Sequence, residues 1–175
     1  EQKEAVECIQ RNGKKQESLV KDILDIYKFS LGKINLSKKE ISLSNLLTNV
    51  VNDLKFILDE KGVSIVTEVK TKTSSTIICD DRRIEQVLSN LIKNSIDFVP
   101  WKEGRILLKV EELEEDKKEE FKAAYINKKD LLFTVKDNGE GIPEDKIDSL
   151  FEKFYQVDVM ASRKYGGTGL GLAIC

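Results

Sequence analysis

The feature that most constrains this chain is a glycine-rich run near its carboxyl end. It spans Lys164 to Leu172, reads Lys-Tyr-Gly-Gly-Thr-Gly-Leu-Gly-Leu and leads into an apolar segment. Glycine lets the backbone approach a ligand closely, and a helix that begins there directs unpaired N–H groups and its positive dipole end at an anion. The run predicts a phosphate-binding turn, although a turn that caps an ordinary helix fits equally well when the run is taken alone.

A second candidate motif follows an apolar run. Residues 131–135, Leu-Leu-Phe-Thr-Val, have the length and composition of a buried strand, and residues 137–143, Asp-Asn-Gly-Glu-Gly-Ile-Pro, come soon after it. A carboxylate fixed at a strand end can accept a hydrogen bond from an adenine amine, and the glycines leave room for the ring. The alternative is a simple turn, with Pro143 at the first position of a following helix.

A third motif lies on a helix that we predict from about Asp81 to Val99. Asp80 or Asp81 would cap its start, and Pro100 would end it. Asn90 and Asn94 are four residues apart, so their amides share one face, where carbonyl oxygens can bind a hard cation such as Mg²⁺. The alternative is two asparagines on a solvated face.

In this order and spacing, the motifs resemble the ATP-binding catalytic domain of two-component sensor histidine kinases. That family shares the Bergerat nucleotide-binding fold with the DNA gyrase B subunit and Hsp90-type chaperones. The resemblance rests on four boxes: the N box at 90–98, the first glycine box at 137–141, the F box at 151–154 and the second glycine box at 166–172. It implies an α+β fold, a two-layer α/β sandwich preceded by a long N-terminal helix from a helical hairpin.

The resemblance also assigns roles at the nucleotide base. Asp137 would bind the adenine amine, Gly139 and Gly141 would admit the ring, and Phe98 would pack against the base. Phe151 and Phe154, in the F box, are interpreted first as packing that anchors the start of a lid over residues 156–165.

At the phosphates, the resemblance makes Asn94 the principal Mg²⁺ ligand and gives Asn90 an assisting role. Arg163 and Lys164, in the lid, would supply positive charge during phosphoryl transfer, so Asn94, Arg163 and Lys164 are the catalytic candidates. The other expected nucleotide-binding residues are Ile142, Gly166, Gly167, Thr168, Gly169, Leu170 and Gly171.

Two positions refine the expected reaction. The gyrase and chaperone ATPases have a glutamate at position 90 that activates water, and the amide of Asn90 cannot take a proton, so we expect phosphoryl transfer to a protein rather than hydrolysis. At position 97 the family usually carries Lys, Arg or His. Asp97 would repel a triphosphate unless it turns away or joins the metal shell, so we expect Asp97→Lys to tighten ATP binding.

The amino-terminal third carries a helical stripe of apolar residues. We interpret residues 1–34 as the second helix of a dimerisation and phosphoacceptor hairpin, 35–40 as a linker and 41–175 as the catalytic domain, and we expect a homodimer through the hairpin. The alternative is an ordinary amphipathic surface helix. The chain has no histidine. We therefore expect a part of a longer kinase that lacks both ends, with a degenerate kinase-like protein as the other interpretation.

The layout between the motifs is predicted from local signals. We expect a short strand at 41–43, a helix opened by Ser44 and ended near Gly62, and strands at 63–69, 105–111 and 131–136 in a mixed, antiparallel-leaning sheet. The charged residues 112–129 fit a solvated extension of a hairpin.

Composition limits the function classes. A net charge of −2 in 175 residues disfavours a nucleic-acid partner, and the three cysteines suggest reduced thiols. With no apolar run of membrane-spanning length, we expect a cytoplasmic domain without membrane contact, and an anchor upstream stays open. The leading hypothesis is an ATP-dependent histidine kinase that serves a response regulator receiver domain. A serine kinase of the anti-sigma-factor type and a non-catalytic nucleotide-sensing module remain alternatives.

Overall fold

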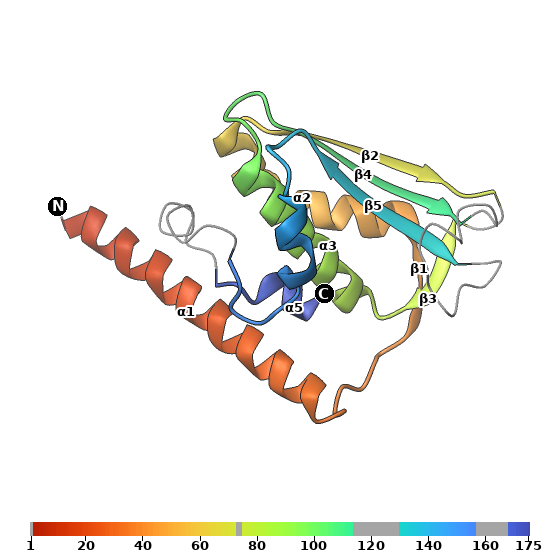
Figure 1. Ribbon diagram of the computed structural model, residues 1–175, viewed down its shortest axis with the longest axis horizontal. Helices are drawn as coiled ribbons and strands as arrows, with labels where there is room; N and C mark the ends of the chain where they lie inside the picture. Colours follow the sequence, from red (N-terminus) through yellow and green to blue (C-terminus); the bar gives the residue numbers. More distant parts are fainter. Residues whose placement is uncertain (1, 73–74, 114–129, 157–167) are drawn as a thin grey trace. The chain divides into compact units, whose positions relative to one another are not determined.

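The computed structural model describes residues 2–72, 75–113, 130–156 and 168–175 (Figure 1). The chain divides into two compact units. The central unit is Leu36–Gly141, and the terminal unit combines Glu1–Asn35 with Ile142–Cys175.

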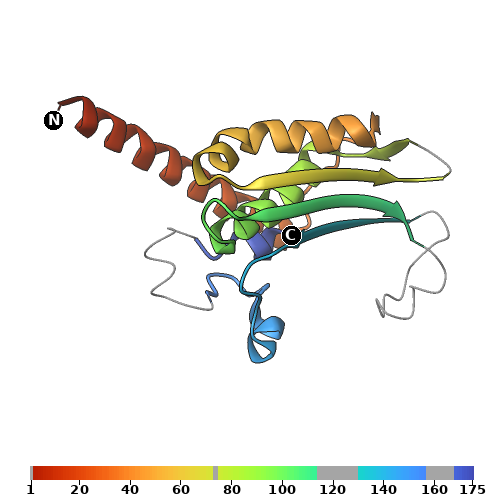
Figure 2. The ribbon, with the colours of Figure 1, turned by 90° about the horizontal axis from the view of Figure 1, so that it is seen from above.

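The described residues of the central unit form two helices and two sheets. Its elements are β1 (Lys39–Ser42), α2 (Leu43–Lys61), β2 (Ser64–Lys70), β3 (Thr76–Cys79), α3 (Asp81–Phe98), β4 (Arg105–Glu112) and β5 (Leu131–Asp137). The larger sheet has the order β2-β4-β5, in which β4 pairs parallel with β2 and antiparallel with β5 (Figure 2). The smaller sheet is an antiparallel pair of β1 and β3. The predicted mixed sheet is confirmed, whereas the strand β3 was not predicted from the sequence.

The core of the central unit lies between the larger sheet and its two helices. Alternate residues of β4, Ile106, Leu108 and Val110, are buried on one face, as the two-residue period of a strand requires. Against them pack apolar residues of both helices, and Figure 1 shows these helices beside the sheet. The apolar residues are Leu43, Leu47, Val50, Leu54 and Leu58 of α2 and Leu88, Ile92 and Ile96 of α3. The core thereby fixes the position of α3 on the sheet.

The ends of α2 follow local capping rules. Ser42 is the N-cap and its Oγ accepts a hydrogen bond from Asn45 N at 3.4 Å, so the expectation that Ser44 opens the helix is wrong by two residues. The shift has a packing reason, since it makes Leu43 part of the helix and buries it completely. Gly62 ends the helix as predicted, with a φ of +64° that glycine adopts readily.

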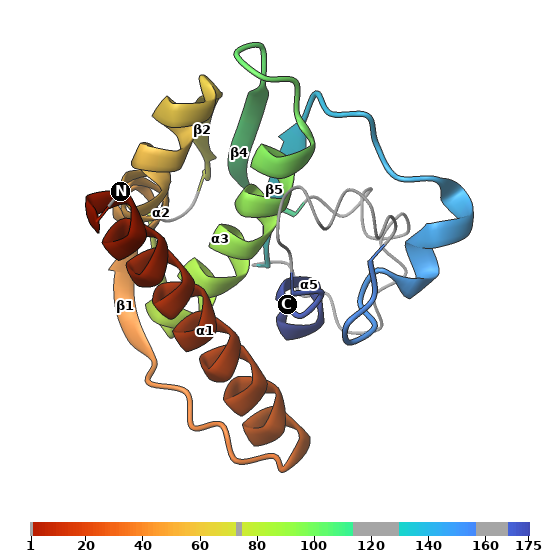
Figure 3. The same ribbon diagram turned by 90° about the vertical axis from the view of Figure 1, so that its left-hand side faces the viewer.

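The terminal unit contains α1 (Gln2–Ser30), the 3₁₀ helix η2 (Glu144–Ser149) and the short α5 (Gly171–Ile174) (Figure 3). The predicted helix over residues 1–34 ends four residues early, before Gly32, which has a φ of +62°. Several apolar side chains of α1 are exposed: Val6, Ile9, Val20, Ile23, Leu24 and Tyr27. In the parts of the chain that the structure describes, no helix combines the length and apolar character needed to span a bilayer. The hairpin extension predicted over 112–129 falls almost entirely outside the described residues.

Candidate nucleotide-binding site

The helix α3 presents the two asparagines of the candidate metal site. It runs from Asp81 to Phe98 with Asp80 as N-cap and ends before Pro100, as its local signals predict. The Asp80 carboxylate is buried and accepts hydrogen bonds from Ser37 N at 2.8 Å and Arg83 N at 3.3 Å. The Ser37 N–H is the main reason that the pKa of Asp80 lies below its ordinary value. The start of α3 is therefore held by a charged cap.

Asn90 and Asn94 lie one helical turn apart on α3, and both are half-buried. Their amide oxygens are neutral donors of the kind that Mg²⁺ accepts together with water and phosphate oxygens. No group of three or more His, Cys, Asp or Glu side chains in the described ranges is arranged to hold a metal. The asparagine pair fits a metal ion that shares its coordination with a bound phosphate.

The Asp137 carboxylate lies at the end of β5 and is held from two sides. Ser95 Oγ, on α3, donates to Asp137 Oδ2 at 2.7 Å, and the Gly139 N–H donates to Asp137 Oδ1 at 2.9 Å. Ser95 is the residue after Asn94, so one turn of α3 connects the candidate metal site with the candidate base site. The exposed carboxylate retains lone pairs that can accept a further hydrogen bond. The structure thus joins the N box and the first glycine box through one hydrogen bond.

The two glycines after Asp137 meet different structural requirements. A Cβ at Gly139 would lie 2.8 Å from the Phe98 carbonyl oxygen, so this glycine lets the loop approach the end of α3. Gly141 has a φ of +77°, and a Cβ there would meet no other heavy atom of the described residues within 4 Å. Among the described residues, nothing fills the space beside Gly141, whereas the Phe98 backbone at the end of α3 closes the space at Gly139.

Asn138, which the sequence reading treated only as a turn residue, fixes the same loop to β4. Its Nδ2 donates to the Glu103 carbonyl oxygen at 3.1 Å, and its Oδ1 accepts from Arg105 N at 2.7 Å. A single amide side chain therefore replaces two backbone partners just beyond the β4–β5 ladder. Such a contact depends on the fold, and the turn composition of the motif gave no signal for it.

Asp97 forms an ion pair within the central unit. Lys61 Nζ, in the last turn of α2, lies 2.6 Å from Asp97 Oδ1 and also donates to the Ile96 carbonyl oxygen at 3.3 Å. The sequence left two alternatives for the Asp97 carboxylate, to turn away from the triphosphate or to join the metal shell. The pairing with Lys61 fits the first. Because a lysine at position 97 would meet Lys61, the tighter ATP binding expected for Asp97→Lys does not follow from this geometry.

In the terminal unit, the F box and the second glycine box meet through the backbone. Phe154 N donates to the Gly169 carbonyl oxygen at 2.8 Å, and both residues have positive φ, +64° and +69°. A Cβ at Gly169 would lie 2.8 Å from the Phe154 carbonyl carbon, so glycine is needed for this approach. Thr168 Oγ1 accepts from Leu170 N at 3.3 Å, and Leu170 is fully buried.

The remaining candidates are placed as follows. Ile142 is exposed, and Gly171 is the first residue of α5. The side chains of Phe151 and Phe154 are 60% and 65% exposed, so they are not the packed pair that the sequence suggested. At Phe154 the backbone, not the ring, makes the contact with Gly169. Arg163, Lys164, Gly166 and Gly167 lie outside the described residues.

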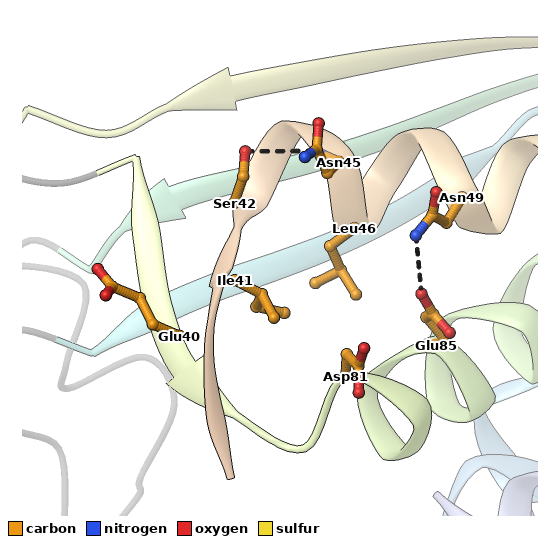
Figure 4. A pocket seen from close by; sticks show the side chains of 8 residues that line it. All are labelled: Glu40, Ile41, Ser42, Asn45, Leu46, Asn49, Asp81 and Glu85. Carbon is orange, nitrogen blue, oxygen red and sulfur yellow. Dashed lines mark hydrogen bonds between the residues drawn. The ribbon is translucent and has the colours of Figure 1, made fainter.

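A separate cavity of about 250 Å³ lies in the central unit, between β1 and the first turns of α2 and α3 (Figure 4). Asp81 and Glu85 line it with their carboxylates, whereas the Glu40 carboxylate points away from it and accepts a hydrogen bond from Thr76 Oγ1 at 2.9 Å (Figure 4). Glu85 accepts from Asn49 Nδ2 at 3.3 Å, and Asp81 pairs with Lys39 at 2.6 Å, which lowers the pKa of the Asp81 carboxyl. The carboxylates of Asp81 and Glu85 make this cavity unsuitable for the anionic end of a nucleotide.

Comparison with known proteins identifies the family of this chain. Residues 79–175 match the family described as histidine kinase-, DNA gyrase B-, and HSP90-like ATPase. The chain therefore belongs to this family. The match covers the whole of α3, β4 and β5 and continues through the second glycine box.

Two curated relatives are named as signalling kinases. The chain is 33% identical over 174 residues to the autoinducer 2 sensor kinase/phosphatase LuxQ of Vibrio parahaemolyticus, which covers 99% of this chain and 19% of that protein. It is 31% identical over 173 residues to the signal transduction histidine-protein kinase BarA of Escherichia coli, covering 99% of this chain and 18% of BarA. The chain thus spans about a fifth of the length of these relatives.

Solved structures show the same fold. Full-length ShkA in complex with AMPPNP aligns with a TM-score of 0.75 and 28% identity, over 98% of this chain and 32% of that one. The Acinetobacter baumannii histidine kinase AdeS aligns with a TM-score of 0.63 and 25% identity, over 90% of this chain and 63% of its own. The α+β fold is that of histidine kinase ATP-binding catalytic domains.

Proposed function

We propose that this chain binds Mg²⁺-ATP beside the second half of α3 and uses it for phosphoryl transfer. The observation that carries the proposal is the Asp137 carboxylate, fixed by Ser95 and Gly139 at 2.7 and 2.9 Å. A carboxylate held in this way is an oriented acceptor for the adenine amine. Phe98, at the last position of α3, would pack against the base.

The metal would bind beside the same helix. Asn94 is the principal proposed ligand and Asn90 assists it, with the remaining positions taken by phosphate oxygens and water. When bound, Mg²⁺ would reduce the negative charge of the phosphates. Further groups complete the proposed nucleotide-binding set. They are the Thr168 hydroxyl, the Ile142 side chain, the charges of Arg163 and Lys164, and the backbone of Gly166, Gly167, Gly169, Leu170 and Gly171.

The proposed reaction is transfer to a histidine. An imidazole nitrogen attacks the γ-phosphorus, the bond from this phosphorus to the β–γ bridging oxygen breaks, and ADP leaves. Asn90 has no basic group with which to activate water, which favours transfer over hydrolysis. The chain contains no histidine, so the acceptor lies outside residues 1–175. From there the phosphoryl group would pass to an aspartate of a response regulator receiver domain.

The proposed domain order is a partial hairpin at 1–34, a linker at 35–40 and the catalytic domain at 41–175. The exposed apolar residues of α1 support a dimerisation role, because a helix with such a stripe is stabilised when a second helix covers it. The proposed assembly is a homodimer through this hairpin.

The test supplies the missing acceptor. The protein is mixed with labelled ATP, Mg²⁺ and a helical hairpin that contains a histidine, and the product is exposed to acid and to base. We expect label on the hairpin that is lost in acid and kept in base, because phosphohistidine is acid-labile. Asn94→Ala and Asp137→Asn, checked for folding by circular dichroism, should abolish transfer. Acid-stable label would indicate a serine kinase, and absence of any transfer would support a non-catalytic module.

A further inference from the structure

The contact between Lys61 and Asp97 joins a residue outside all four boxes to one inside the N box. The ammonium nitrogen lies 2.6 Å from Asp97 Oδ1 and 3.3 Å from the Ile96 carbonyl oxygen. The two side chains are only 20% and 34% exposed, so the pair is partly shielded from water. A partly buried ion pair with an added hydrogen bond is a more defined contact than a pair on an open surface.

The position of Asp97 makes this contact relevant to the nucleotide. Asn90, Asn94 and Asp97 stand at positions i, i+4 and i+7 of α3, which place them along one side of the helix. Asp97 lies about 4.5 Å along the helix axis from Asn94. An uncompensated carboxylate at this place would repel any anion bound beside the asparagines.

We propose that Lys61 is a positioning residue for the phosphates of the nucleotide. It neutralises Asp97 and holds its carboxylate toward the end of α2, and it also binds the last turn of α3 through Ile96. The inference rests on the proposed Mg²⁺-ATP site on α3. It adds Lys61 to that site, a residue that lies 36 positions before Asp97 and belongs to α2.

A charge effect can be separated from a structural one through the ligand. If Lys61 acts by compensating Asp97, its loss will weaken binding in proportion to the negative charge of the ligand. If Lys61 only supports the fold, its loss will weaken binding of charged and uncharged ligands alike. ATP, ADP and adenosine share the base and sugar and differ in phosphate charge, so they form a suitable series.

The experiment measures the Kd of these three ligands by calorimetry in the presence of Mg²⁺. For Lys61→Gln we expect about fivefold weaker binding of ATP, about twofold weaker binding of ADP and unchanged binding of adenosine, because carboxylate–phosphate repulsion is only partly screened. Adding Asp97→Asn to Lys61→Gln should restore ATP binding to within twofold of the unaltered protein. Lys55→Gln removes the same charge from an exposed position of α2 and should change no Kd.

The outcomes separate the two proposals. An unchanged Kd for ATP in Lys61→Gln, an equal loss for all three ligands, or a double variant no better than Lys61→Gln would each overturn the role of Lys61 while leaving the ATP site intact. If the unaltered protein binds neither ATP nor ADP, the proposed function and this inference both fail. The double variant keeps the test valid if Lys61→Gln alone folds poorly, because it has no unpaired carboxylate at position 97.

Discussion

Removal of the Ser95 hydroxyl tests how the base end of the site is held. Ser95 Oγ is 2.7 Å from Asp137 Oδ2, and Ser95 itself is buried. A hydrogen bond to a charged group contributes about 1.5–3 kcal/mol, but water can replace part of it at the exposed Asp137 carboxylate. For Ser95→Ala we therefore expect a loss of about 1 kcal/mol in ATP binding, which corresponds to about a fivefold increase in Kd.

The assay compares two nucleotides by calorimetry with Mg²⁺ present. One is ATP, and the other is a purine nucleoside triphosphate that lacks the 6-amino group. If Ser95 orients Asp137 toward that amine, Ser95→Ala will weaken ATP binding and leave the binding of the analogue unchanged. Ser89→Ala is the matched control, because it removes the same hydroxyl from the same helix six residues earlier. It should change neither Kd.

Two results would refute this reasoning. An equal loss of affinity for both nucleotides would show that Ser95 supports the packing of α3 and does not act through the amine. An unchanged Kd for ATP would show that the Gly139 N–H alone is enough to orient the carboxylate.

Two further predictions concern the loop and the helix cap. Gly139→Ala should weaken ATP binding and destabilise the fold by about 1–3 kcal/mol, because its Cβ would lie 2.8 Å from the Phe98 carbonyl oxygen. Gly141→Ala should destabilise the fold by only about 1 kcal/mol, the strain of a non-glycine residue at a φ of +77°. Equal losses of unfolding free energy in urea titrations would contradict this difference. The lowered pKa of Asp80 means that its charge stabilises the fold above the unfolded pKa of about 3.9 and that this contribution is lost as the pH falls through the folded value. The thermal midpoint of the unaltered protein should therefore exceed that of Asp80→Asn at pH 7, and the difference should shrink as the pH falls through the folded pKa of Asp80. A difference that stays constant as the pH falls would rule out the charge as the cause.

Local signals were sufficient for the helices that carry the site. The bounds of α3 follow from Asp80, which accepts the first backbone N–H groups, and from Pro100, which cannot continue a helix. The end of α2 at Gly62 was equally clear. Its start was not, because Ser42 and Ser44 are both good caps and only the burial of Leu43 decides between them.

Contacts between distant parts of the chain could not be predicted from the sequence. The strand β3 has four residues, and it is stabilised by pairing with β1, about 40 residues earlier. Likewise, the partners Ser95–Asp137 and Lys61–Asp97 are 42 and 36 residues apart. Serine, lysine and aspartate are ordinary residues on a helix surface, so nothing in their local pattern indicates which of them meet. The sequence predicts the motif residues, but the side chains that contact them are known only from the fold.

The parallel pairing of β2 with β4 has a consequence for the order in which this molecule can assemble. The two strands meet in a register that joins Ser64 to Arg105, and the connection between them contains β3 and α3. Neighbouring parallel strands need such a crossover, and contacts of this sequence separation form slowly. During synthesis, α3 therefore emerges before β4, but the sheet on which it packs can form only after β4 has left the ribosome. Ligand binding should consequently appear only after β4 has been synthesised.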